Sequence, residues 1–227
     1  MLDGLLPHGV MSRELRRQGC EADLLGAERL DIARAVESRR REFAAGRHCA
    51  RHALAQLGFA ERPLRAGHDR RPCWPDGSVG SITHAAAYAA AVAGRRGAFA
   101  GLGIDAESSD RVEPELWPEI CRPEELAYLR GLPAARQRIA ATLFFSAKES
   151  LYKAQYEITR AWLGFLDATV DIGESSFVID VPALRSVASD GRFSGRYRVD
   201  GGLIVTAVAI WASAVSEFEP APRAPDG

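Results

Sequence analysis

Two stretches of this chain have the apolar spacing of a long α-helix, and each is followed by short segments typical of β-strands. Residues 38–57 carry apolar side chains at helical intervals, and Gly58 follows at the position where a helix commonly ends. Residues 134–156 form a second, longer helical stretch, introduced by Pro133. Each helix must bury its apolar face against another layer, and the neighbouring strands supply one.

The strand-like segments are short, rich in β-formers and separated by turn residues. After the first helix they are 87–93 and 99–107, and after the second they are 165–172, 177–181, 193–199 and 203–211. We therefore predict an α+β fold of two similar lobes, each a long helix against a small, mostly antiparallel sheet.

The chain of 227 residues is long enough to give each lobe a core of its own. We expect an N-terminal lobe at residues 1–107 and a C-terminal lobe at 108–218, because the polar, proline-containing stretch 108–118 resembles a boundary or a mobile loop. Residues 219–227 are rich in proline and charge, so we expect a disordered tail there.

Composition excludes several classes of function. The 29 basic and 30 acidic residues leave a formal net charge of −1, so no global positive field can hold nucleic acid or an anionic membrane. No apolar run reaches the length of a membrane span, and the N-terminus lacks the pattern of a signal peptide. The four cysteines are scattered without a C-x-x-C pair. We expect a cytoplasmic protein.

Only two of the 29 basic residues are lysine, and both lie on the second helix. On a helical wheel the apolar arc is formed by Leu143, Ala147, Leu151 and Ala154, and the opposite arc by Lys148, Glu149, Tyr152 and Lys153. This pattern predicts an acid flanked by two ammonium groups on an exposed face. The alternative is a solvated polar face with one Glu–Lys pair of little energy.

Two carboxylates stand two residues apart in the segment Gly103-Ile104-Asp105-Ala106-Glu107. If the segment is a strand, Asp105 and Glu107 face the same side, where their like charges repel and favour a bound cation. Mg²⁺ suits such hard oxygen ligands. The alternative is an exposed strand end with two solvated acids.

A third motif precedes His84. Trp74 and its neighbouring prolines form a stiff loop, and small and hydroxylated residues then lead into His84. Ser81, Thr83 and His84 could be presented to an anion. The alternative is that Trp74 plugs the core and that His84 is a core or turn histidine.

Together the three motifs, in this order and spacing, resemble the 4′-phosphopantetheinyl transferase superfamily, and most closely its monomeric surfactin-type class and the branch of enterobactin synthetase component D. The resemblance covers roughly residues 38–154. It implies an enzyme that moves the 4′-phosphopantetheine arm of coenzyme A to a serine of an apo acyl- or peptidyl-carrier protein and releases adenosine 3′,5′-bisphosphate. It also implies a pseudo-twofold pair of lobes with coenzyme A in the cleft between them.

The resemblance also implies roles for the residues of the site. Mg²⁺, or Mn²⁺ in its place, would be held by Asp105, Glu107 and Glu149. Glu149 and Lys153 are the candidate catalytic residues, with Glu149 acting either as the base for the serine proton or only as a metal ligand. A low pKa for Glu149, set between two lysines and a metal, would argue against a strong direct base.

Coenzyme A would be bound through its phosphates. The resemblance assigns this contact to Lys148, Lys153, His84, Thr83 and Ser81. It assigns the 3′-phosphate to Arg39 and Arg47, with Arg40 as the alternative to Arg39. Relatives often carry a lysine in the loop before Trp74, where this chain has arginines, and Arg70 is the candidate there.

The carrier protein is expected to contact residues 114–132 and the start of the second long helix. Exposed apolar side chains are predicted at Leu116, Trp117 and Leu129, and charges complementary to an acidic carrier at Arg122, Arg130, Arg136 and Arg138. The pathway served stays open among fatty acid, polyketide, non-ribosomal peptide and siderophore synthesis. The alternatives to a transferase are a non-catalytic module that binds coenzyme A or carrier protein, and an unrelated Mg²⁺-dependent phosphohydrolase.

Overall fold

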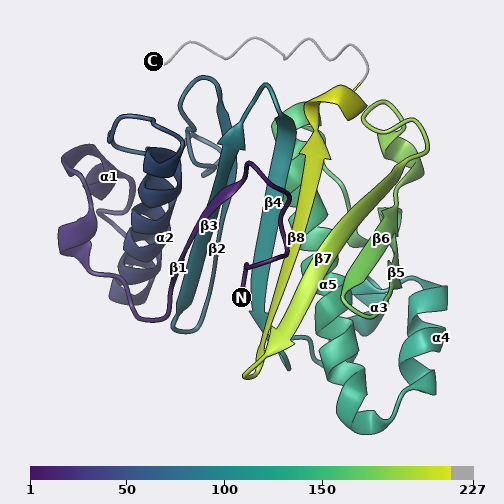
Figure 1. Ribbon diagram of the computed structural model, residues 1–227. Helices are drawn as coiled ribbons and strands as arrows, with labels where there is room; N and C mark the ends of the chain where they lie inside the picture. The colour runs from purple at the N-terminus through teal and green to yellow at the C-terminus, as the bar shows by residue number, and fades with distance from the viewer. Residues whose placement is uncertain (216–227) are drawn as a thin grey trace.

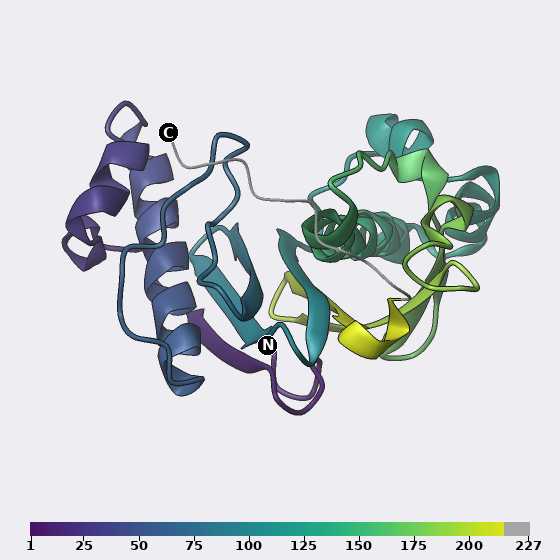
Figure 2. The same cartoon turned by 90° about the horizontal axis from the view of Figure 1, so that it is seen from above.

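A computed structural model describes residues 1–215 and contains two lobes side by side (Figures 1 and 2). Each lobe places one long helix against an antiparallel sheet, which confirms the predicted α+β class and the two-lobe arrangement. The predicted tail at 219–227 and the last three residues of the predicted second lobe lie outside the described residues.

The first lobe packs helix α2 on a three-stranded sheet of order β1-β3-β2. Its elements are β1 (Met11–Leu15), α1 (Gly26–Asp31), α2 (Glu37–Gln56), β2 (Ser78–Ala85) and β3 (Tyr88–Arg95). Small side chains line the contact: Ala50 and Ala53 of α2 share one buried cluster with Ala91 of β3. Such small residues allow the helix to approach the sheet closely. The buried Trp74 belongs to the same cluster.

The second lobe packs α5 on a five-stranded sheet of order β4-β8-β7-β6-β5. Its elements are β4 (Phe99–Ser108), α3 (Trp117–Ile120), α4 (Pro123–Gly131), α5 (Ala134–Thr159), β5 (Thr169–Ile172), β6 (Ser176–Asp180), β7 (Arg192–Asp200) and β8 (Leu203–Trp211). The core forms where Phe144 and Leu151 of α5 meet Phe177 and Ile179 of β6. Figure 1 shows α3 and α4 grouped beside α5.

Most predicted strands are confirmed to within about two residues, but the segment 165–172 is strand only over Thr169–Ile172, after a 3-10 turn at Phe165–Asp167. The sequence did not reveal β1, β2 or the short helices. In β2 the reason is visible: Ser78, Gly80, Ser81 and Thr83 are small and polar residues that resemble a loop, yet all four are buried. Tertiary packing, not strand propensity, makes this segment a strand.

The lobe boundary differs from the predicted one. Strand β4 pairs antiparallel with β8, with Asp105 opposite Thr206, so it belongs to the sheet of the second lobe. The predicted boundary after residue 107 assigns β4 to the first lobe and therefore cuts through this sheet. By strand pairing the first lobe ends with β3.

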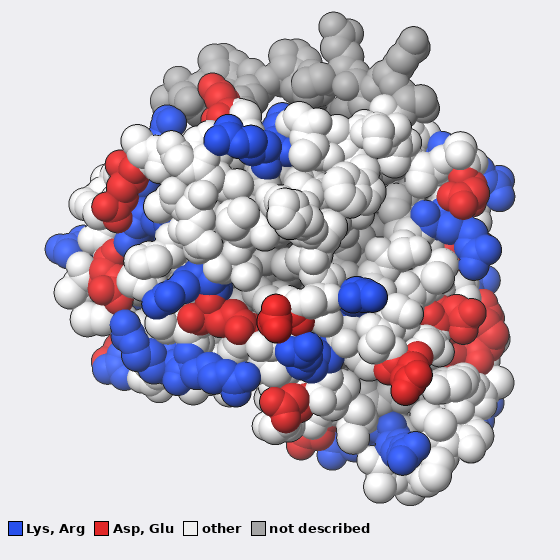
Figure 3. Space-filling view, in the orientation of Figure 1, with Lys and Arg blue, Asp and Glu red and all other residues white. Residues whose placement is uncertain are grey.

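On the face seen in Figure 3, acidic and basic side chains lie next to one another around a broad uncharged area, and neither sign dominates. This agrees with the near-zero net charge of the chain. Among residues 1–215 no helix combines the length and the apolar character needed to cross a membrane.

Candidate active site

One face of β4 packs closely against α5 and also carries two carboxylates. Gly101, Gly103, Asp105 and Glu107 alternate along the strand and so share the face turned toward α5. A Cβ on Gly103 would lie 1.8 Å from the carbonyl oxygen of Ser150, so the backbone of α5 rests directly on the glycines. The next two positions on the same face carry carboxylates. The glycines thus set the depth at which the acids lie beneath α5.

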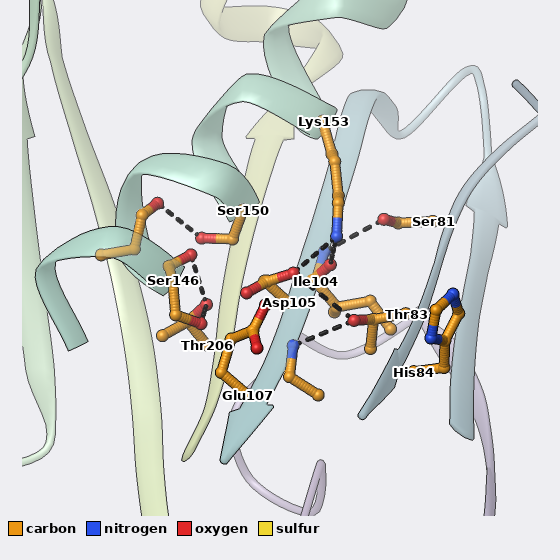
Figure 4. A network of polar contacts seen from close by, with 12 residues as sticks. Ser81, Thr83, His84, Ile104, Asp105, Glu107, Ser146, Ser150, Lys153 and Thr206 are labelled. Atoms are coloured by element: carbon orange, nitrogen blue, oxygen red, sulfur yellow. Dashed lines mark hydrogen bonds and ion pairs between the residues drawn. The ribbon is translucent and has the colours of Figure 1, made fainter. Parts of the chain in front are cut away.

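Asp105 is buried, and its two oxygens differ in their contacts (Figure 4). Oδ1 accepts a hydrogen bond from Lys153 Nζ at 2.7 Å, and the Thr83 hydroxyl lies 3.5 Å away. Lys153 Nζ also donates to the carbonyl of Ile104 at 3.2 Å. Oδ2 is buried without a hydrogen-bond partner in the described structure. A buried carboxylate oxygen with no partner is costly unless a cation or donor joins it.

Two further carboxyl groups lie where burial disfavours their charged form, a cost that a bound cation would offset. Burial, reinforced by Asp105, raises the pKa of Glu107 to about 7. Burial also raises the pKa of Glu149, although Lys153 opposes the shift. Hard oxygen donors of this kind fit Mg²⁺, and the unpartnered Oδ2 of Asp105 is one such donor. Within residues 1–215 no three acids, histidines or cysteines already stand together as a complete metal site.

The predicted exposure of Lys148 is wrong. Its side chain is 3% exposed, and Nζ donates to Glu125 Oε2 at 2.7 Å and to the carbonyl of Ile120 at 2.8 Å. The cause is the packing of α3 and α4 over this side of α5, which the helical wheel does not contain. Glu149 is therefore not flanked by two ammonium groups. Burial raises the pKa of Glu149 although Lys153 opposes the shift, and the low pKa expected for this carboxylate beside a bound metal stays a prediction.

The hydroxyls of the third motif join the two lobes. The backbone N–H of Ile104 donates to Ser81 Oγ at 3.1 Å, and that of Ala106 donates to Thr83 Oγ1 at 2.9 Å. Both hydroxyls are buried, and they link β2 to β4 in place of a backbone ladder. They hold the strand that carries Asp105. Their binding of phosphate stays a prediction.

This contact gives a test at Thr83. Replacement by valine leaves the buried N–H of Ala106 without an acceptor, so we expect the free energy of unfolding to fall by about 1–3 kcal/mol. Thr83→Ser keeps the hydroxyl and serves as the matched control. Urea denaturation of both variants measures the difference, and equal midpoints would show that the hydroxyl does not hold the two strands together.

His84 and Arg39 meet at the end of β2. Arg39 Nη1 lies 2.8 Å from His84 Nε2, and Glu42 Oε2 lies 3.7 Å from His84 Nδ1. Burial is the main cause that lowers the pKa of His84, so the neutral ring is suited to accept a hydrogen bond from Arg39 at neutral pH. Half of the Arg39 side chain remains exposed. The structure thus brings together two residues to which the resemblance assigns phosphate binding.

Arg47 and Arg70 do not join that pair. Arg47 is buried, its Nε donates to the carbonyl of Leu64 at 2.6 Å, and burial lowers the pKa of its guanidinium to about 10. Arg70 is exposed and has a left-handed backbone with φ of 66°. Its neighbour Arg71 instead reaches the second lobe, where Nη1 donates to Glu157 at 2.8 Å. The sequence holds no local feature that distinguishes Arg70 from Arg71, so it could not reveal which of the two reaches the second lobe.

The predicted carrier-facing segment is partly exposed. Leu116 is 38% exposed, whereas Leu129 is fully buried, so its predicted exposure is wrong; Tyr128, one position earlier on α4, is 47% exposed instead. The arginines divide into two kinds. Arg122 and Arg138 form ion pairs with Glu124 and Glu113, and Arg130 and Arg136 are exposed.

Two family models match most of this chain. The chain matches the model of the 4′-phosphopantetheinyl transferase N-terminal domain over residues 27–94 and that of the 4′-phosphopantetheinyl transferase superfamily over residues 101–185. The second match begins with β4, in agreement with the observed strand pairing. The protein therefore belongs to the 4′-phosphopantetheinyl transferase superfamily.

Individual relatives agree with this assignment. The chain is 41% identical to 4′-phosphopantetheinyl transferase PptT of Mycobacterium tuberculosis, over 79% of this chain and 82% of that protein. It is 36% identical to 4′-phosphopantetheinyl transferase Npt of Nocardia iowensis, over 92% and 99% respectively. It is 42% identical to enterobactin synthase component D of Salmonella typhimurium, over 59% and 56%. The resemblance inferred from the three motifs, and the identification as a phosphopantetheinyl transferase, are confirmed.

Proposed function

We propose that this protein transfers the 4′-phosphopantetheine arm of coenzyme A to a serine of an apo carrier protein in a Mg²⁺-dependent reaction. The observation that carries the proposal is the carboxylate pair of β4 beneath α5: buried Asp105 has one oxygen on Lys153 and one without a hydrogen-bond partner, and half-buried Glu107 lies on the same face. Family membership supplies the reaction class. The monomeric, cytoplasmic state expected from the sequence is part of the proposal.

The reaction exchanges the phosphoanhydride bond of coenzyme A for a phosphoester bond to the carrier serine. The serine oxygen forms a bond to the phosphorus that bears the pantetheine arm, and the bond from this phosphorus to the bridging pyrophosphate oxygen breaks. Adenosine 3′,5′-bisphosphate leaves with the electron pair, and the serine proton passes to a base. The protein must neutralise charge on the phosphoryl oxygens and on the leaving group.

The carboxylates of Asp105, Glu107 and Glu149 would hold Mg²⁺, which supplies charge neutralisation at the two phosphates when bound. Lys153 adds a fixed ammonium on the same side of β4, held by Asp105 at 2.7 Å. Glu149 accepts the serine proton, directly or through one water.

Coenzyme A is bound through its phosphates in this proposal. Arg39 and His84 are the best supported contacts, because they meet within 2.8 Å and both remain partly exposed. Arg47, Arg70, Ser81 and Thr83 stay predictions. The carrier protein docks near α3 and α4, where Leu116 and Tyr128 are exposed, and the exposed Arg130 suits an acidic carrier helix.

Intact-mass spectrometry of apo carrier proteins tests the metal requirement. We expect a carrier incubated with coenzyme A, Mg²⁺ and this protein to gain the mass of one phosphopantetheine group, and a chelator to stop the gain until Mg²⁺ is restored. Mn²⁺ is expected to substitute. Equal rates with and without the chelator would contradict the metal role assigned to the carboxylates.

A further inference from the structure

Lys148 and Glu125 form a buried ion pair where four segments of the second lobe meet. Their side chains are 3% and 1% exposed, and Nζ lies 2.7 Å from Glu125 Oε2. The same ammonium donates to the carbonyl of Ile120, at the end of α3. Buried charges of this kind are rare without a partner, so each residue requires the other.

Glu125 extends the junction to two further segments. Its Oε2 also accepts the backbone N–H of Arg122, just before α4, at 2.7 Å. Its Oε1 accepts the backbone N–H of Val170, in the edge strand β5, also at 2.7 Å. One carboxylate thus joins the start of α4 and β5, and Lys148 connects both to α5 and to the end of α3.

Lys148 of this junction is the direct neighbour in sequence of Glu149, which the proposed function places in the reaction. Successive residues of a helix point about 100° apart, so Lys148 faces α4 while Glu149 takes another direction. A shift of α3 and α4 along α5 would change the distance between the exposed side chains of this segment and Glu149. An ion pair that ties α4 to α5 would hold that distance constant.

We propose that the Lys148–Glu125 pair is a positioning device that sets α3 and α4 for the incoming carrier protein, and that Lys148 does not bind coenzyme A. The inference rests on the proposed function, because it takes α3 and α4 as the carrier side. Lys148 therefore acts through α3 and α4 on the acceptor, and Lys153 is the lysine that faces the acidic strand.

The geometry also explains why lysine stands here in a chain whose other basic residues, Lys153 apart, are arginine. The described acceptors around the ammonium are one carboxylate oxygen and one carbonyl. A guanidinium is planar and brings five N–H donors, several of which would be buried without acceptors. Lys148→Arg should therefore disturb the junction although it keeps the charge.

The experiment separates carrier recognition from coenzyme A binding. For Lys148→Met and Lys148→Arg we expect the KM for the carrier to rise at least tenfold, while the Kd for coenzyme A, measured by calorimetry, stays within twofold. The exposed Arg185→Met is the control for loss of one positive charge in this lobe. A tenfold weaker Kd for coenzyme A with an unchanged carrier KM would overturn the proposal, and so would variants that match the wild type in both.

Hydrogen exchange gives a readout that does not depend on transfer. The amides of Arg122 and Val170 should exchange at least tenfold faster in Lys148→Met, whereas amides of β3 in the first lobe should keep their rates. Unchanged exchange at both amides would overturn the positioning role. If unaltered protein modified no carrier, the proposed function would fail, and the exchange rates would still decide whether the pair holds the junction.

A double variant covers the case in which the single variant does not fold. Lys148→Met/Glu125→Gln removes both charges and keeps a carbonyl oxygen at position 125 for one backbone N–H. We expect this variant to fold and to retain the raised carrier KM, because the link from α5 to α4 is gone. A wild-type carrier KM in the double variant would overturn the proposal.

Discussion

Asp105→Asn is expected to lower the rate of phosphopantetheine transfer about a thousandfold, which corresponds to ~4 kcal/mol of transition-state stabilisation. The amide keeps the shape of the side chain but removes the charge that holds Lys153 at 2.7 Å. It also removes the unpartnered, buried Oδ2 that is suited to a cation. The phosphates would then lose both the ammonium of Lys153 and the cation held by Oδ2. The initial rate of carrier mass gain at saturating coenzyme A and carrier measures the effect.

Asp171→Asn is the matched control for this substitution. Asp171 is exposed on the edge strand β5 of the same sheet and should keep the rate within twofold. Thermal unfolding of both variants, followed by circular dichroism, shows whether the fold is retained. If Asp105→Asn kept more than a tenth of the wild-type rate while folded, Asp105 would not be part of the catalytic centre.

Gly103→Ala is expected to have the largest effect on stability. Its Cβ would lie 1.8 Å from the carbonyl oxygen of Ser150 and 2.9 Å from the backbone nitrogen of Ala154, and neither backbone atom can move without moving α5. We expect the free energy of unfolding to fall by about 3 kcal/mol or more. For a chain of this length such a loss lowers Tm by roughly 6–12 °C. Transfer should fall as well, because β4 and α5 carry the two halves of the site.

Gly26→Ala controls for the substitution itself. Gly26 is the first residue of α1, has no atom within 4 Å of an added Cβ, and does not adopt a left-handed backbone. Its Tm should stay within about 2 °C of the wild type, since a glycine replaced at an unstrained position costs little. If Gly103→Ala unfolded at the same temperature as Gly26→Ala, the contact between β4 and α5 would be looser than the structure indicates.

Local patterns in the sequence were enough to predict part of the site. Asp105 and Glu107 stand two apart, and the period of a strand puts them on one face whatever the rest of the fold does. Glu149 and Lys153 stand four apart, and the period of a helix does the same for them. The strand and the helix that carry these residues were both predicted with bounds close to those observed.

The remainder depends on contacts between distant parts of the chain. Lys148 is buried because Glu125, 23 residues earlier, folds over it, and Leu129 is buried by the same packing of α4. Strand β4 joins the second sheet because β8, near the end of the described chain, pairs with it. Ser81 and Thr83 are drawn into the contact between the lobes by the N–H groups of β4. No local spacing encodes these partners.

The central claim is that the site beneath α5 moves phosphopantetheine from coenzyme A to a carrier serine. Its most direct test follows both products of one reaction: the modified carrier, by intact mass, and adenosine 3′,5′-bisphosphate, by chromatography, with and without carrier. The account predicts one bisphosphate for each modified carrier, and neither product when the carrier is omitted or its acceptor serine is replaced by alanine. Bisphosphate released at the same rate without any carrier would contradict the account and would indicate a phosphohydrolase.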